Sequence, residues 1–122
     1  MSPGVEMLKR ALEDLAADAD AQLGSLRRQG CIPPELYIDE LALDYDAIAM
    51  AAEGMLLDGE LDEPACDAVE SLNRYLSSIS GRENARLWTE KALRHSPEWQ
   101  KARSMATHCL AMLRSSQLNT ND

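Results

Sequence analysis

Asp58, Glu60 and Asp62 stand at alternate positions in a short acidic segment, a spacing that could provide oxygen ligands for calcium. An EF-hand loop starting at Asp58 would need glycine at its sixth position and glutamate at its twelfth, and these positions hold Glu63 and Val69. The segment therefore predicts an acidic turn in which Asp62 caps the next helix, and it predicts no metal site.

The residue types that most often perform nucleophilic or metal chemistry are sparse. The chain has two histidines and three cysteines: His95, His108, Cys31, Cys66 and Cys109. His108 and Cys109 are adjacent, and neighbours on a helix diverge by about 100°, which is too far for them to share one ion well. No Cys-x-x-Cys, Glu-x-x-His, glycine-rich phosphate loop or Gly-x-Ser-x-Gly motif is present. We predict no catalytic residue, no metal and no cofactor, and therefore no enzyme.

Charge is unevenly distributed along the chain. A run of 45 residues, 29–73, contains no Lys or Arg and holds 12 carboxylates, and most of the net charge of -9 arises there. The last 49 residues have eight basic and four acidic side chains. The pattern predicts an anionic surface region, which disfavours direct binding to nucleic acid or anionic lipid. Four arginines of the last third could form a second binding face, but they are expected instead to neutralise part of this acidic middle: Arg82, Arg86, Arg94 and Arg103.

Length and composition predict one helical domain. The 122 residues suffice for a single core, and 45% hydrophobic content indicates a folded rather than a disordered chain. The chain has no Phe and is rich in Leu and Ala, which favours helix. Residues 1–28 lack the apolar segment of a signal peptide, and the apolar stretch 47–57 is too short and too interrupted to span a bilayer. The odd, scattered cysteines favour a reducing cytoplasm, where they would be buried thiols.

Apolar periodicity and capping residues predict four to five helices. A long first helix, near 3–29, starts at Ser2-Pro3 and stops at Gly30. A second starts between Pro34 and Asp39 and ends at Asp58-Gly59, and a third runs from Asp62 to Ser80-Gly81. Residues 81–95 predict a short helix or two single turns, and Ser96-Pro97 starts the last helix.

Each helix has a row of apolar residues predicted to be buried. The rows are Val5, Leu8, Leu12, Leu15, Ala19, Leu23 and Leu26; Ile38, Leu41, Tyr45, Ile48, Ala52 and Leu56; Val69, Leu72, Leu76 and Ile79; and Trp99, Ala102, Ala106, Cys109 and Leu113. Trp88 and Trp99 are predicted to anchor the short segment between them on the bundle, and the alternative is an aromatic contact at an interface. The prediction is an all-α, single-domain bundle over 1–114, with a frayed tail at 115–122. The conformation of 32–38 is left open.

The second helix has a further apolar row on its opposite side. Leu43, Met50 and Leu57 are spaced seven apart, with Ala47 and Gly54 beside them. Carboxylates border this row: Asp39, Asp46 and Glu53 on one edge, and Glu40 and Asp44 on the other. One interpretation is a central helix buried on both sides. The other is a partner site with an apolar centre and an acidic rim, and the carboxylates favour it because unpaired charges are costly to bury.

Parts of the chain resemble small acidic α-helical immunity proteins of bacterial polymorphic-toxin and contact-dependent inhibition systems. The resemblance lies in Leu57–Glu63, in Ser80–Leu93, and in Ser96-Pro97-Glu98-Trp99 followed by Arg103. It covers about a third of the chain, and no functional residue can be transferred because such families share no common site. The resemblance implies one-to-one occlusion of a toxin domain in the cytoplasm, and many such toxins have a cationic cleft.

We therefore predict a non-catalytic inhibitor that binds a basic protein. The predicted partner-binding residues are Asp39, Leu43, Asp46, Met50, Glu53, Leu57, Asp58, Glu60 and Asp62. The acidic side chains would supply charge, and Leu43, Met50 and Leu57 would supply the desolvated centre. The alternative is a homo-oligomeric structural or secretion-chaperone-like module, for example a homodimer, in which the same apolar row is a self-interface.

Overall fold

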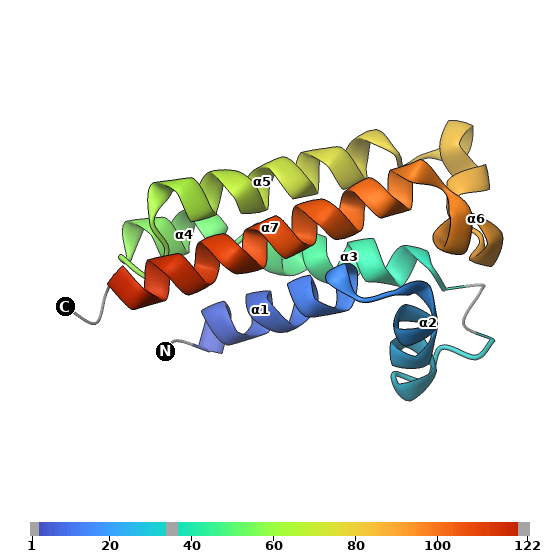
Figure 1. The fold of residues 1–122 in the computed structure, drawn as a ribbon, viewed down its shortest axis with the longest axis horizontal. Helices are drawn as coiled ribbons and strands as arrows, with labels where there is room; N and C mark the ends of the chain where they lie inside the picture. The colour runs from blue at the N-terminus through green and yellow to red at the C-terminus, as the bar shows by residue number, and fades with distance from the viewer. Residues whose placement is uncertain (1–2, 34–36, 120–122) are drawn as a thin grey trace.

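The computed structural model describes residues 3–33 and 37–119, with side chains for 4–33 and 37–114. Within these residues the chain is all-α, with seven α-helices, one 3-10 helix and no strand. Four helices form an antiparallel bundle: α1 (Pro3–Ala16), α3 (Asp39–Ala49), α5 (Glu63–Ser78) and α7 (Pro97–Asn119). α1 contacts α3 and α7, and α5 contacts the same two helices. α3 and α7 therefore both lie between α1 and α5 (Figure 1). The all-α class is confirmed, but the predicted count of four to five helices is wrong.

The predicted long first helix is divided at Ala17–Asp18 into α1 and α2 (Ala19–Arg28), and α2 turns away from the bundle axis (Figure 1). Asp18 is extended at φ -71° and ψ 169°, and its Oδ1 accepts a hydrogen bond from Ala21 N at 2.8 Å. The fully buried Gln22 donates from Nε2 to the carbonyls of Asp14 (3.2 Å) and Leu15 (3.0 Å). These bonds satisfy backbone groups that the break would otherwise leave unpaired.

We expect Asp18→Ala to lower the free energy of unfolding by about 1 kcal/mol, since it removes the cap of α2. Urea unfolding followed by circular dichroism measures the change. Glu13→Ala is the matched control, because it also removes one exposed carboxylate nearby but caps nothing, and its effect should stay within about 0.5 kcal/mol. Equal effects of the two substitutions would show that the cap does not stabilise the break.

The predicted second helix is also divided, into α3 and α4 (Ala52–Leu57), with Met50 and Ala51 between them. Ala51 N bonds to Ile48 O at 3.1 Å, so the backbone tightens to a 3-10 turn without leaving helical geometry. Ala49, Ala52 and Met55 are buried at intervals of three, the period of such a tightened turn. The 3-10 turn therefore allows the end of α3 and the whole of α4 to bury the same side of the chain in the core.

The predicted apolar rows form the core. Most of their residues are buried, while Ala19, Ile48 and Leu56 are only partly buried. Tyr45 lies fully buried among them and donates from its hydroxyl to Val69 O at 2.7 Å, which joins α3 to α5. The rows predicted from periodicity are thus confirmed.

The segment between α5 and α7 folds into two short pieces, as predicted: η2 (Arg82–Leu87) and α6 (Glu90–His95). Trp88 and Trp99 anchor it, which confirms their predicted role. Their rings meet edge to face with centroids 5.2 Å apart. Trp88 Nε1 donates to Ile79 O at 2.8 Å, and Trp99 Nε1 donates to Leu87 O at 2.6 Å.

The ends of the elements match several sequence signals. Gly30, Gly59 and Gly81 have φ values of 88°, 78° and 97°, a region that favours glycine, and each follows the end of a helix. α3 begins at Asp39, Ile32–Pro33 is a cis peptide bond, and 34–36 lie outside the described residues. α7 continues to Asn119, into the predicted tail, whose residues 120–122 lie outside the description. No described helix is long and apolar enough to cross a membrane.

Candidate partner-binding face

The outward side of α3 and α4 carries an apolar strip, which we define as Leu43, Met50 and Leu57. These three side chains are 53%, 75% and 81% exposed. Ala47, Ala51 and Gly54 are exposed as well and continue the strip. This exposure contradicts the interpretation that the predicted second helix is buried on both sides, because the side with Leu43, Met50 and Leu57 is open to solvent. Three large apolar side chains in line on the surface are a feature of interaction sites.

Carboxylates surround the strip, and together with it they form what we call the α3–α4 face. Asp39, Glu53 and Asp58 are exposed, whereas Asp46 and Glu60 are partly buried. Asp62 is also partly buried, and its Oδ1 accepts a hydrogen bond from Ala65 N at 2.9 Å as the cap of α5. The role that the structure shows for Asp62 is therefore the cap of α5. The other five carboxylates contribute negative charge to the rim.

The ion pairs of the described residues do not join the arginines of the last third to the acidic middle of the chain. Within the described residues, both ion pairs are made by Arg94, with Asp20 at 2.7 Å and Glu90 at 3.2 Å. Arg103 instead donates to Gln22 Oε1 at 3.0 Å and to the carbonyl of Leu93. α6 lies at the opposite end of the bundle from α4 (Figure 1), whereas Asp39 at the start of α3 lies beside the turn that leads into η2 with its Arg82 and Arg86. Within the described residues, no ion pair joins Asp39, Asp46, Glu53, Asp58 or Glu60 to a basic side chain.

Two hollows lie beside the strip, one on each side of α3. The groove towards α1 has a volume of about 410 Å³, and its lining residues are Met7, Arg10, Ala11, Asp14, Gln29, Asp44, Ala47 and Ile48. Partial burial raises the pKa of the Asp14 carboxyl, although the Ser25 hydroxyl and Arg28 oppose this. The second hollow, of about 260 Å³, lies towards the turn after α5, and its lining residues are Asp39, Ala42, Leu43, Ser80, Gly81 and Trp88.

Sequence reasoning missed the residues that distant elements bring to α3. Met7 comes from α1, and Ser80, Gly81 and Trp88 come from the turn after α5 and the end of η2. Periodicity places a residue on a helix face but does not say which other segment packs beside that face. The absence of Met7 from the buried row of its helix was the one available signal.

The Cys66 and Cys109 thiols and the Tyr45 phenol are buried in the core, whereas Cys31, predicted to be a buried thiol, is only partly buried. Burial raises the pKa of the Cys66 thiol to about 11, with Glu70 adding to the effect, and burial also raises the pKa of Cys109 to about 11. Both thiols are protonated near neutral pH and are weak nucleophiles. Burial likewise raises the pKa of the Tyr45 hydroxyl. In the part of the chain that is described, no group of three or more His, Cys, Asp or Glu side chains could hold a metal ion.

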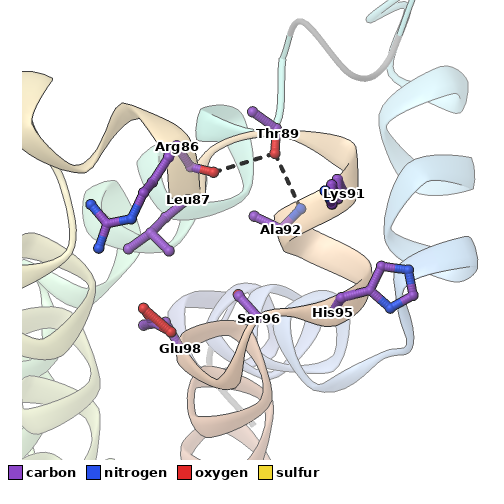
Figure 2. Close-up of a pocket in the computed structure, with 8 residues that line it drawn as sticks. All are labelled: Arg86, Leu87, Thr89, Lys91, Ala92, His95, Ser96 and Glu98. Carbon is purple, nitrogen blue, oxygen red and sulfur yellow. Dashed lines mark hydrogen bonds between the residues drawn. The ribbon is translucent and has the colours of Figure 1, made fainter.

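A third hollow lies where η2, α6 and the start of α7 meet, and its volume is about 340 Å³. Figure 2 shows the Arg86 guanidinium and the His95 imidazole on opposite sides of it, so these groups do not converge on one point. Thr89 Oγ1 accepts from Ala92 N at 3.1 Å as the cap of α6, and Ser96 caps α7. The Thr89 and Ser96 hydroxyls at this hollow thus stabilise the starts of α6 and α7.

The α3–α4 face carries three of the six large apolar side chains that are exposed among the described residues. Comparisons with models of protein families, with curated proteins and with solved structures found no match. What the face offers chemically is apolar area for desolvation, negative charge for attraction, and two adjoining hollows for partner side chains.

Proposed function

We propose that the protein is a non-catalytic inhibitor of the immunity or antitoxin kind, which acts in the cytoplasm by covering a basic partner domain with its α3–α4 face. The observation that carries this proposal is the exposure of Leu43, Met50 and Leu57 in a segment that also carries the exposed carboxylates Asp39, Glu53 and Asp58. A face of this kind suits a partner that has an apolar contact surrounded by Lys and Arg.

The two components of the face would contribute differently to binding. Full burial of one Leu or Met side chain is worth about 1.5–3 kcal/mol before the costs of association, so the strip can supply a desolvated centre. The rim would mainly raise the association rate and select basic partners. A toxin domain that acts on nucleic acid carries a cationic cleft, and an anionic face is complementary to such a cleft.

Self-association is the rival explanation of the same strip. A symmetric dimer would place each α3–α4 face against its copy, because both subunits use the same patch in a two-fold interface. Asp39, Asp46 and Glu53 would then approach carboxylates of the second copy, and like charges in an interface are unfavourable. The rim therefore favours a basic partner over a homo-oligomeric or secretion-chaperone-like module.

Affinity capture combined with mass measurement tests the proposal. The protein, immobilised as bait in an extract of its native host, should retain one basic protein at equal stoichiometry, and retention should fall as salt rises. Met50→Asp bait should lose this protein, and Ile32→Asp bait should keep it, because Ile32 is equally exposed but lies in the loop before α3. By light scattering the free protein should have the monomer mass of 13.5 kDa. A dimer that retains nothing would support the rival.

A further inference from the structure

The hollow between α3 and the turn after α5 adjoins the apolar strip, since Leu43 belongs to both. Its volume of about 260 Å³ is below the range of roughly 300–1,000 Å³ typical of small-molecule sites. A space of this size, open to solvent at the edge of an interaction surface, suits a single side chain of a binding partner.

The apolar part of the lining consists of Ala42, Leu43 and the Trp88 indole. Trp88 Nε1 already donates to Ile79 O at 2.8 Å, so the N–H group of this ring is not available to a ligand in the hollow. The Trp99 ring also contacts the Trp88 ring edge to face, with centroids 5.2 Å apart. The wall is thus an aromatic surface that is already held in place before any ligand arrives.

The polar part of the lining consists of hydrogen-bond acceptors. The Asp39 carboxylate is exposed at the first position of α3 and makes no ion pair with any described residue. The Ser80 hydroxyl donates to Leu76 O at 2.7 Å, which leaves its oxygen to accept. None of the six lining residues is cationic, unlike the groove on the other side of α3, where Arg10 is present.

We propose that this hollow receives an arginine side chain of the basic partner, an inference that rests on the proposed function. The guanidinium would pair with the Asp39 carboxylate, and its stem and plane would lie on Leu43 and Trp88. Arginine fits better than lysine because its planar group can bind a carboxylate through two hydrogen bonds and stack on an aromatic ring. A cation already lies over an aromatic ring elsewhere in this fold, with Lys101 Nζ 4.8 Å from the centre of the Tyr75 ring.

A peptide titration monitored by nuclear magnetic resonance tests the assignment. Acetyl-Gly-Arg-Gly-amide is added to ¹⁵N-labelled protein, and the versions with lysine and with citrulline, the neutral analogue of arginine, are added separately. We expect the arginine peptide to shift the Trp88 indole and Gly81 amide signals, with a dissociation constant on the order of millimolar. The amide of Leu113, which is buried near the opposite end of α7, supplies the unshifted reference signal. Lysine should bind more weakly, and citrulline should cause no shift.

Asp39→Asn should weaken arginine binding about threefold or more, because it removes the charge of the acceptor. Asp67→Asn makes the same change at an exposed position of α5 that does not line this hollow. This variant should bind the arginine peptide as the unmodified protein does. The inference is overturned if citrulline shifts Trp88 as much as arginine does, if no peptide shifts Trp88, or if Asp39→Asn binds arginine normally.

The outcomes for the hollow and for the proposed function are distinguishable. One outcome is that a partner is captured, is lost with Met50→Asp and is bound equally well by Asp39→Asn. This result would support the inhibitor function and contradict the assignment of arginine to this hollow. Arginine-selective shifts at Trp88, without any captured partner, would support the hollow as an arginine site and count against the inhibitor function.

Discussion

Met50→Asp is expected to weaken binding of the captured basic partner by about a hundredfold or more. Met50 lies between α3 and α4 in the middle of the apolar strip and is 75% exposed. Truncation of a central apolar residue in an interface commonly costs about 2–4 kcal/mol, and a factor of ten in affinity corresponds to about 1.4 kcal/mol. The carboxylate would also have to be desolvated at the centre of the contact.

Met50→Lys separates the apolar contribution from the electrostatic one. If only charge governs binding, an extra carboxylate at Met50 should strengthen attraction to a basic partner, and a lysine should weaken it. If the strip is the desolvated centre, both variants should bind poorly. We expect both to lose affinity, with Met50→Lys also associating more slowly at low salt.

Titration calorimetry with the purified captured protein measures these affinities, and circular dichroism checks the fold. Because Met50 is exposed, its variants should remain within about 1 kcal/mol of the unmodified protein in stability. Ile32→Asp, at 70% exposure of Ile32, controls for the introduction of a charge at an exposed apolar position. Normal binding by Met50→Asp would exclude the strip as the binding centre.

The core could be predicted from the sequence because burial on a helix repeats every three to four residues. Leu8, Leu72 and Trp99 stand on such rows, and all three are fully buried. Caps were equally readable, since Asp62 and Ser96 occupy positions where a side-chain oxygen meets an unpaired amide. These are local signals, and they require no knowledge of which helices become neighbours.

The divisions of the first two long helices depend on contacts that periodicity does not report. The break at Asp18 is stabilised by Gln22, which in turn accepts from Arg103, 81 positions further along the chain. The break at Met50–Ala51 contains no Gly or Pro, so nothing local marks it. It follows from packing, because the 3-10 turn keeps Ala52 and Met55 in the core.

The acidic and apolar residues of the candidate face were predicted, but their surroundings were not. The spacing of Leu43, Met50 and Leu57 placed them on one side of a helix, and only the tertiary structure shows that this side is uncovered. Trp88 was interpreted as an anchor, which is correct, yet the same ring also lines a hollow beside Asp39. A residue that both supports the fold and borders a surface site gives no separate signal in a sequence.

Trp99→Ala is expected to lower the free energy of unfolding by about 3–5 kcal/mol, the largest stability effect we predict. Trp99 is completely buried, donates to Leu87 O at 2.6 Å and packs edge to face against Trp88. The substitution would open a cavity, leave the Leu87 carbonyl without its donor and remove the support of Trp88. Domains of this size are stable by only about 5–15 kcal/mol, so a large part of the total would be lost. Urea unfolding monitored by circular dichroism measures this loss, and a change below about 1 kcal/mol would contradict the role of Trp99 as an anchor.

Trp99→Phe distinguishes the hydrogen bond from the packing of the ring. It keeps an aromatic side chain against Trp88 but leaves the Leu87 carbonyl unpaired, which should cost about 1–3 kcal/mol. Since the ring contact persists in this variant, Trp88 should stay in place and the arginine peptide should bind the hollow with nearly unchanged affinity. Strong loss of peptide binding in a folded Trp99→Phe protein would show that Trp88 is positioned by the hydrogen bond of its neighbour rather than by the contact between the two rings.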